Sequence, residues 1–338
     1  MKAGVIGEGK MGSGIFNFLL EKNVQLVWLC SQHADIDKLD RQVKRRMLRL
    51  HNIDFYNTED YMAGKKPMVT NDIHALSDCD LIIESIPEDL RLKKSLFLEL
   101  DKIVKAEAIL TSNSSSIKPS DYTPSVNRAD KIAGLHFFYP VALKNIVEIN
   151  LGTETSAATI EILTTFLEEI DRKHLLLGAD HVFMLNKIFL DVQNEAWNLV
   201  EAGHCSQSEM DQMVRNNLFP FGIFDFFDSV GLDTMLASIL NYTIDYPHRD
   251  YYSPLIRGLE KLVDQGKTGM KSGEGFYVYP HEPIHASEPS NSDELVNHLR
   301  QSWLSASKRF TARAHIPIEE ANEAIKAYFG VDRGPFDQ

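Results

Sequence analysis

The sequence predicts an α/β domain with a doubly wound sheet, followed by an all-α C-terminal domain. Two observations predict this fold class. Through the first half of the chain, short apolar runs of strand length alternate with amphipathic helical segments, which is typical of a parallel sheet. From about residue 183 onward the apolar residues recur mainly at helical spacing. At 338 residues the chain is long enough for about two domains, each with its own core.

The bulk composition is that of an ordinary globular protein, with 43% hydrophobic and 25% charged residues. A net charge of -13 argues against nucleic-acid binding, although a local basic patch can still bind an anionic ligand. Cys30, Cys79 and Cys205 form no CxxC pair, so we expect neither a disulfide framework nor a metal site. The chain opens on a strand rather than a signal peptide, and no apolar run approaches the roughly 18 residues of a membrane span. We therefore expect a cytoplasmic protein with no membrane partner.

A short strand and a glycine-rich turn open the chain. We expect a buried strand over Ala3 to Ile6, then Gly7-Glu8-Gly9-Lys10-Met11-Gly12, which matches G-x-G-x-x-G, then a helix over Ser13 to Leu20. A second strand over Gln25 to Leu29 completes the β-α-β context. In this context the motif predicts a Rossmann-type dinucleotide site. A glycine-rich turn in another kind of α/β protein is the alternative.

Each glycine of the turn has a separate role in such a site. Gly7 would permit the tight turn, Gly9 would let a pyrophosphate approach the backbone, and Gly12 would let helix and strand pack closely. The helix N-terminus would add N–H donors and a favourable dipole, so we expect the cofactor phosphates there.

The end of the second strand departs from the usual NAD pattern. An NAD site commonly has Asp or Glu about 20 residues past the glycines, where it hydrogen-bonds the ribose 2′-hydroxyl. Here that stretch reads Leu29-Cys30-Ser31-Gln32-His33, and the first acid is Asp35. The stretch also lacks an arginine for a 2′-phosphate. We expect NAD, with NADP as the alternative.

The segment from Asp35 to about Lys66 is predicted to be helical and carries a basic cluster. Such a run of charges is either a solvated helix face or a clamp for the phosphates of a large anionic substrate, such as a coenzyme A thioester. The sequence leaves both interpretations open. The cluster consists of Lys44, Arg45, Arg46 and Arg49.

Two further strands are expected before the middle of the chain. Asp80 to Ser85 is one, and the turn Ile86 to Asp89 leads from it into a helix that carries Lys93. Ile109 to Thr111 is the other, and it ends in the loop Ser112-Asn113-Ser114-Ser115-Ser116. Ligands of α/β proteins bind at the carboxyl ends of strands, so this loop is either part of a binding site or a polar turn with a helix cap.

We expect the catalytic residues where two strands place a carboxylate beside a histidine. The run Lys131 to Leu135 is predicted to be a buried strand, with His136 at its end and Pro140 stopping the run. Ile146-Val147-Glu148-Ile149 alternates like a second strand. Joined by a short loop, the two strands can bring Glu148 back beside the imidazole, which is the geometry of an oriented general base. A core histidine with a surface glutamate is the alternative.

The remaining patterns divide the chain into domains. A strand over Lys173 to Leu177 would be the last of a dinucleotide-binding domain, residues 1–178. A long helix over Phe183 to Glu201 opens a helical domain, residues 179–283. Asn186 lies near the start of that helix, where an amide either satisfies a backbone group or serves a site.

Residues 284–338 are predicted to be a linker and a helical tail. The stretch Pro280 to Asn291 is rich in Pro, Ser, His and acids, which is typical of a linker. A shift of 111 residues sets Asn297 on Asn186 and Glu320 on Glu209, and brings Gly334-Pro335-Phe336-Asp337 within a residue of Gly222-Ile223-Phe224-Asp225. The tail is either a truncated second copy of the helical domain or an unrelated helical pair packed on the body.

Taken together, these segments resemble the L-3-hydroxyacyl-CoA dehydrogenase family over roughly residues 1–283. The resemblance is specific because several motifs match jointly and in order. They are Gly7-x-Gly9-x-x-Gly12, Ser85-Ile86-Pro87-Glu88-Asp89 with Lys93, Ser112-Asn113-Ser114-Ser115-Ser116, His136-Phe137-Phe138 with Glu148, Asn186, and Lys271-Ser272-Gly273-Glu274-Gly275-Phe276-Tyr277.

The resemblance implies a role for each matching residue. His136 would be the general base that takes the hydroxyl proton, and Glu148 would hold the imidazole and stabilise its positive charge. Ser115 and Asn186 would hydrogen-bond the substrate oxygen in the manner of an oxyanion hole. The cofactor would lie against Gly7, Gly9, Lys10, Met11, Gly12, Glu88, Lys93, Ser115 and Lys271.

The same resemblance implies hydride transfer between NAD and the C3 hydroxyl or keto group of a 3-hydroxyacyl-CoA, by a homodimer. The sequence also departs from the family pattern, with Tyr139 in place of the usual Asn and Gly222-Ile223-Phe224 in place of Gly-Pro-Phe. These departures leave the substrate open to alternatives: a free hydroxy acid such as gulonate or carnitine, or a carrier-protein-bound hydroxyacyl group. A non-catalytic dinucleotide-binding protein is a further alternative.

Overall fold

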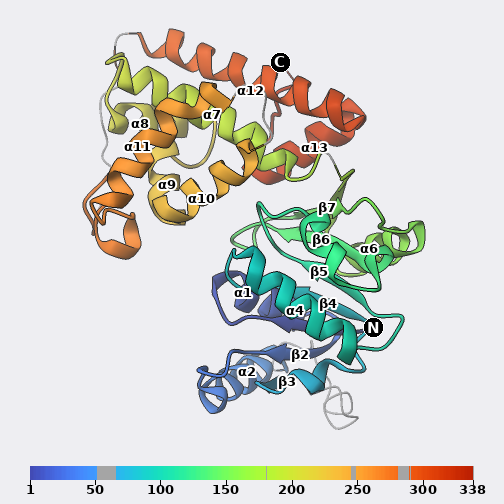
Figure 1. The fold of residues 1–338 in the computed structure, drawn as a ribbon. Helices are drawn as coiled ribbons and strands as arrows, with labels where there is room; N and C mark the ends of the chain where they lie inside the picture. Colours follow the sequence, from blue (N-terminus) through green and yellow to red (C-terminus); the bar gives the residue numbers. More distant parts are fainter. Residues whose placement is uncertain (52–65, 180, 245–248, 281–288, 290, 338) are drawn as a thin grey trace. The chain divides into compact units, whose positions relative to one another are not determined.

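The computed structural model describes residues 1–51, 66–179, 181–244, 249–280, 289 and 291–337. These residues form two compact units, Met1–Val182 and Phe183–Gln338 (Figure 1). The first unit is an α/β layer structure and the second is helical, so the predicted fold class is confirmed.

Within the described residues, the first unit contains an eight-stranded sheet in the order β3-β2-β1-β4-β5-β6-β7-β8. Strands β1 to β6 are parallel, β7 is antiparallel to β6, and β8 is parallel to β7. The carboxyl ends of β1 to β6 therefore meet at one edge of the sheet, here called the carboxyl edge. The strands are β1 (Lys2–Ile6), β2 (Gln25–Leu29), β3 (Met68–Thr70), β4 (Leu81–Glu84), β5 (Ile109–Ser112), β6 (Ile132–Phe137), β7 (Ile146–Leu151) and β8 (Lys173–Leu177).

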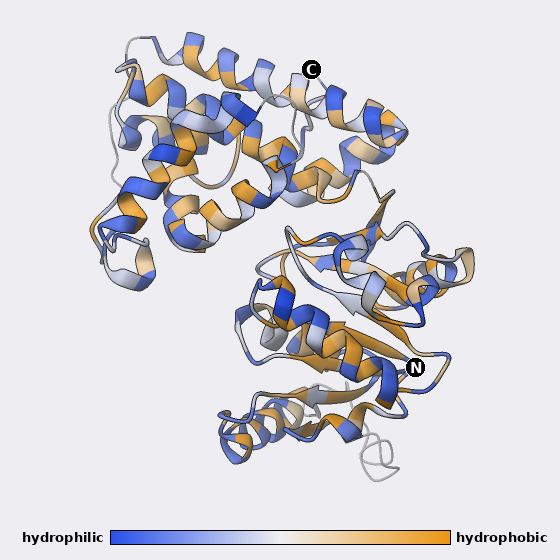
Figure 2. Ribbon diagram, in the orientation of Figure 1, coloured by the Kyte–Doolittle hydropathy of each residue, from blue (hydrophilic) through white to orange (hydrophobic). Residues whose placement is uncertain are grey.

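Helices cover both faces of this sheet. Because both faces are covered, its strands are near-continuous apolar runs rather than alternating ones, and Figure 2 shows them mainly in the hydrophobic colour. One apolar core joins the sheet to α1 (Lys10–Leu19), α2 (Ile36–His51) and α6 (Ala157–Glu169). A second core, on the other face, joins it to α4 (Leu90–Ile103) and α5 (Pro119–Tyr122).

Several elements differ from the expected ones, and α1 begins at Lys10 rather than at Ser13. Strand β3 was not predicted, because a strand of three residues is too short to show a periodic pattern of hydrophobic residues. The helix expected from Asp35 to about Lys66 is described as α2 over Ile36–His51, and the rest of its range, 52–65, lies outside the described residues. His136 lies inside β6 rather than after its end, since its backbone still pairs with β7.

The second unit is built from helices, and none of those in the described part of the chain is long and apolar enough to cross a bilayer. Helix α12 packs along α7. An aromatic cluster holds the tail against the body, with Phe219 stacked on Phe329 at 4.3 Å and edge-on to Trp303 at 5.2 Å. The helices are α7 (Met184–Glu201), α8 (Gln207–Asn217), α9 (Ile223–Val230), α10 (Leu232–Thr243), α11 (Ser253–Asp264), α12 (Ser292–Ala314) and α13 (Ile318–Phe329).

The helical tail matches the first part of this unit in detail. A shift of 111 residues lays α8 on α13, and it sets Asp211 on Asn322. Asp211 Oδ1 accepts a hydrogen bond from the Phe224 N–H at 2.8 Å, and Asn322 Oδ1 accepts one from the Phe336 N–H at 3.3 Å. These correspondences favour the truncated second copy, which stays a prediction. The linker expected over 280–291 lies mostly outside the described residues.

Candidate active site

The glycine turn lies at the carboxyl edge, directly after β1. Gly7 has a φ of 107°, a conformation that favours glycine, and a Cβ there would lie 2.5 Å from the Ser85 carbonyl oxygen. A Cβ at Gly12 would lie 2.2 Å from the Gly7 carbonyl oxygen. A Cβ at Gly9 would meet nothing within 4 Å. Gly7 and Gly12 are therefore required by the fold itself, whereas Gly9 borders open space.

The space beside Gly9 suits a phosphate group. Helix α1 begins at Lys10, and its N-cap residue Gly9 offers no side chain to the first N–H groups. An uncapped helix start with N–H groups and a positive dipole end is a ready anion site. Lys10 is exposed and Met11 is half-buried beside the core, so both flank this start.

A carboxylate does reach the end of β2, although β2 carries none. Glu8 accepts hydrogen bonds from the Ser31 hydroxyl at 2.5 Å and from the Ser31 N–H at 3.0 Å. Burial raises the pKa of Glu8, but the bonds from Ser31 outweigh it and hold the pKa below its usual value. Sequence reasoning missed this acid because it stands in a variable position of the glycine motif, 23 residues before Ser31.

A buried ion-pair network lies under the carboxyl edge at the end of β4. The Lys93 ammonium lies 2.7 Å from Glu84 Oε1 and 3.5 Å from Glu88 Oε2. The side chains of Lys93 and Glu84 are 1% and 0% exposed. Lys93 therefore binds two carboxylates inside the protein, and its direct contact with a cofactor stays a prediction.

Glu88 organises the serine loop that follows β5. One of its oxygens, Oε1, accepts bonds from the Ser114 hydroxyl, the Ser115 N–H, the Ser116 N–H and the Ser116 hydroxyl, at 2.5 to 3.1 Å. Burial raises the pKa of Glu88, but the charge of Lys93 and these bonds hold it below its usual value. Ser114 and Ser116 are buried, whereas Ser115 is half-buried. Glu88 therefore holds the loop through bonds to Ser114, Ser115 and Ser116, and Ser115 is the one of these serines that stays partly exposed.

The histidine and the glutamate meet across the antiparallel pair β6–β7. His136 and Glu148 are register partners, and His136 Nδ1 lies 2.9 Å from Glu148 Oε2. Both are buried, at 4% and 0% exposure. The ring of Phe138 packs against the imidazole with ring centres 4.3 Å apart. Because Glu148 engages Nδ1, a proton taken from a substrate would go to Nε2.

Asn113 ties the serine loop to the histidine strand. Its Oδ1 accepts a hydrogen bond of 2.8 Å from the N–H of Phe137, the residue next to His136. Strands β5 and β6 are neighbours in the sheet, with Ser112 opposite Gly134. The structure thus brings Ser115, His136 and Glu148 to neighbouring strand ends. Asn113 was part of the quoted motif, but nothing in the sequence indicated this bond.

Two predicted site residues belong to the second unit. The Asn186 amide N–H donates to the Tyr242 hydroxyl at 2.8 Å, and its Oδ1 accepts from the Tyr328 hydroxyl at 3.0 Å. The Lys271 ammonium lies 2.5 Å and 2.6 Å from the two oxygens of Asp233. Each of the two therefore has partners within its own unit.

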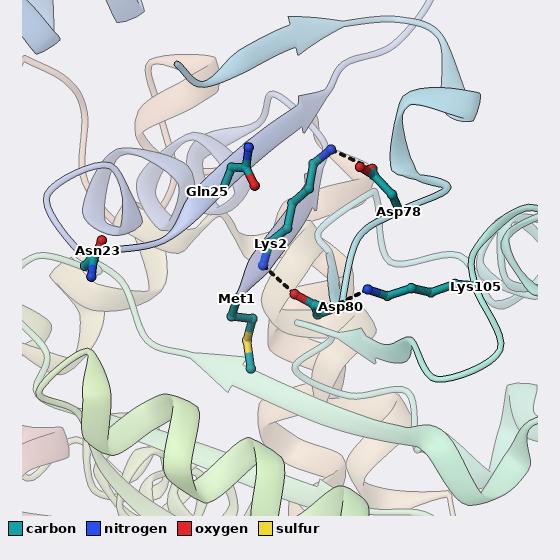
Figure 3. A pocket seen from close by; sticks show the side chains of 7 residues that line it. All are labelled: Met1, Lys2, Asn23, Gln25, Asp78, Asp80 and Lys105. Carbon is teal, nitrogen blue, oxygen red and sulfur yellow. Dashed lines mark hydrogen bonds and ion pairs between the residues drawn. The ribbon is translucent and has the colours of Figure 1, made fainter. Parts of the chain in front are cut away.

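Two other charged regions carry no comparable site. In the basic cluster, Lys44 pairs with Asp40 and Arg46 pairs with Glu21, which favours the solvated face over the clamp. A polar hollow of about 490 Å³ lies at the opposite, amino edge of the sheet (Figure 3). Its charges bind one another: Lys2 pairs with Asp78, and Lys105 pairs with Asp80.

Comparison with known proteins identifies the family. The model of the 3-hydroxyacyl-CoA dehydrogenase NAD-binding domain matches residues 2–180, and that of the C-terminal domain matches residues 183–279. The chain belongs to the 3-hydroxyacyl-CoA dehydrogenase family. It is an NAD-binding oxidoreductase with 3-hydroxyacyl-CoA dehydrogenase activity, which confirms the reaction class and the cofactor that the sequence predicted.

Relatives of this family are similar over most of the chain. A probable 3-hydroxybutyryl-CoA dehydrogenase from Deinococcus radiodurans is 33% identical over 283 residues, which cover 82% of this chain and all of that protein. The (S)-3-hydroxybutyryl-CoA dehydrogenase structure from Ralstonia eutropha is 26% identical, with a TM-score of 0.73 over 83% of this chain and 99% of that one. A 3-hydroxybutyryl-CoA dehydrogenase structure from Escherichia coli is 19% identical and shares the fold over 99% of this chain and 90% of that one, with a TM-score of 0.85.

Proposed function

We propose that this dehydrogenase acts on a short-chain 3-hydroxyacyl-CoA, with His136 as its general base. The observation that carries the proposal is the buried His136–Glu148 pair, which lies on the strands next to the serine loop. A carboxylate that holds Nδ1 orients the imidazole and stabilises the positive charge it gains. The relatives named above as 3-hydroxybutyryl-CoA dehydrogenases support the short acyl chain.

The residues at the carboxyl edge fit the cofactor. The uncapped start of α1 and the open space beside Gly9 suit a pyrophosphate, and Glu8 places a carboxylate at the end of β2. A carboxylate there favours a ribose hydroxyl and repels a 2′-phosphate, which supports NAD over NADP. When bound, NAD supplies the hydride acceptor.

Side chains of the protein accept the hydroxyl proton and bind the substrate oxygen. His136 takes the hydroxyl proton as the C3–H bond breaks, so C3 becomes a ketone carbon and the imidazole carries the proton. Ser115 and Asn186 hydrogen-bond the substrate oxygen and stabilise its developing negative charge. We propose further that Glu88, Lys93 and Lys271 support the cofactor, and that the protein is a cytoplasmic homodimer with its subunits joined through the helical unit.

A substrate panel tests the proposal. We expect the highest kcat/KM with acetoacetyl-CoA and NADH, a lower value with the pantetheine thioester, and little turnover of free acetoacetate, gulonate or carnitine. Equal turnover of the pantetheine and CoA thioesters would instead indicate a carrier-bound substrate. A preference for a free acid, or a flat NADH absorbance trace with every substrate, would contradict the proposal.

Two glycine variants separate the cofactor's needs from those of the fold. Gly9→Ala should leave stability unchanged, because its Cβ meets no protein atom and its φ of -68° suits alanine. It should nevertheless weaken NADH binding about tenfold or more, because a methyl group there obstructs the pyrophosphate. Fluorescence titration of NADH measures the effect.

Gly12→Ala is the matched control. Its Cβ would collide with the backbone of Gly7, so thermal unfolding should show a loss of about 1–3 kcal/mol as well as weaker binding. If Gly9→Ala bound NADH with wild-type affinity, the cofactor phosphates would not bind at the glycine turn.

A further inference from the structure

The amide of Asn186 lies between two tyrosine hydroxyls. Tyr242, on α10, accepts a bond from the amide nitrogen at 2.8 Å, and Tyr328, on α13, donates to the amide oxygen at 3.0 Å. Both tyrosines are 8% exposed. Neither bond is local, since Tyr328 lies 142 residues from Asn186 in the chain.

These two bonds hold the Asn186 amide between the two hydroxyls. An asparagine amide has one acceptor oxygen and two N–H donors, and rotation about its last bond exchanges them. The Tyr328 hydroxyl occupies the oxygen, and Tyr242 occupies one N–H. In this orientation the amide has a second N–H donor besides the one given to Tyr242. A developing alkoxide needs a donor and is repelled by a carbonyl oxygen.

Aromatic contacts hold α13 of the tail against α7 and α12 of its own unit. The Tyr328 ring packs against Phe329 with ring centres 4.8 Å apart and against Phe189 of α7 at 6.4 Å. Phe329 in turn packs against Phe189 and Trp303 at 5.3 Å each. Phe189 and Asn186 lie one helical turn apart on α7, so the same aromatic contacts hold the tyrosine and its amide partner.

We propose that Tyr328 is a positioning residue, by which the C-terminal tail orients the Asn186 amide toward the substrate oxygen. Tyr328 lies beyond the matched family domains, which end at residue 279. The tail would thus contribute to catalysis although it lies outside both of those domains. The inference rests on the proposed role of Asn186 in binding the substrate oxygen.

The test is Tyr328→Phe in the full-length protein. It removes one hydroxyl and keeps the ring, so the aromatic contacts and the melting temperature should change little. Loss of one hydrogen bond that aligns the amide should lower kcat roughly three- to tenfold, with KM for acetoacetyl-CoA and the Kd for NADH nearly unchanged. Tyr251→Phe is the matched control, because it removes a hydroxyl bonded to Glu195 in the same unit and should leave kcat unchanged.

A double-mutant cycle with Asn186→Ala separates this inference from the proposed function. Once Asn186 is truncated, Tyr328→Phe should have no further effect on kcat. If Asn186→Ala lowers kcat but Tyr328→Phe does not, or if the two losses multiply, the positioning role is wrong and the proposed function stands. If Asn186→Ala leaves kcat unchanged, the proposed role of Asn186 and the positioning role of Tyr328 both fail, whereas the general-base role of His136 is unaffected.

Discussion

Replacing His136 with glutamine should lower kcat by roughly 10²- to 10⁴-fold, the range over which a positioned general base accelerates proton transfer. Glutamine is close in size and polar, so it can keep a hydrogen bond to Glu148, but it cannot take the hydroxyl proton. NADH should bind almost as before, because the glycine turn follows β1 and is not part of the histidine strand. Steady-state kinetics and NADH titration measure the two effects.

A second histidine provides the control for that result. His174 lies on β8 and pairs with Val147 rather than with Glu148, so His174→Gln should retain kcat within about twofold. Glu148→Gln should lose activity because the imidazolium is no longer stabilised by a charge. Near-normal turnover by His136→Gln would show that residue 136 is not the base.

Replacing Lys93 with methionine should lower the free energy of unfolding of the first unit by about 3–5 kcal/mol. Methionine fills a similar volume but leaves the carboxylate of Glu84 buried at 0% exposure without its cation. An isolated buried charge costs more than the loss of the attraction itself. Urea denaturation of the full chain, followed by circular dichroism and tryptophan fluorescence, measures the change.

Two variants identify the cause of that loss. Lys102→Met changes an exposed lysine on the same helix and should stay within about 0.5 kcal/mol of the wild type. Glu84→Gln combined with Lys93→Met removes both charges and should recover much of the stability lost by Lys93→Met alone. A double variant less stable than the single one would mean that the unpaired carboxylate of Glu84 does not cause the loss.

Much of the first unit could be predicted because its local patterns agree with its fold. Lys173–Leu177 is a strand with the predicted bounds, and β1, β2, β4 and β5 begin or end within a residue of the predicted bounds. The pairing of His136 with Glu148 could be expected, because two consecutive strands joined by a short loop usually lie side by side. The three-residue strand β3 was not predictable, since its pairing with β2 comes from the sheet.

The sequence by itself determined the motifs, their order and the residue types that chemistry requires: the glycine turn, the serine loop, the histidine, the glutamate and the amide. The tertiary structure alone decided how these groups are held. It placed Lys93 inside the protein, brought Glu8 to Ser31, and joined Asn186 to Tyr328 of the tail. The physical reason is the distance along the chain over which each effect acts. Periodicity and turn chemistry act over a few residues, whereas burial and hydrogen-bond partners depend on segments that only folding brings together.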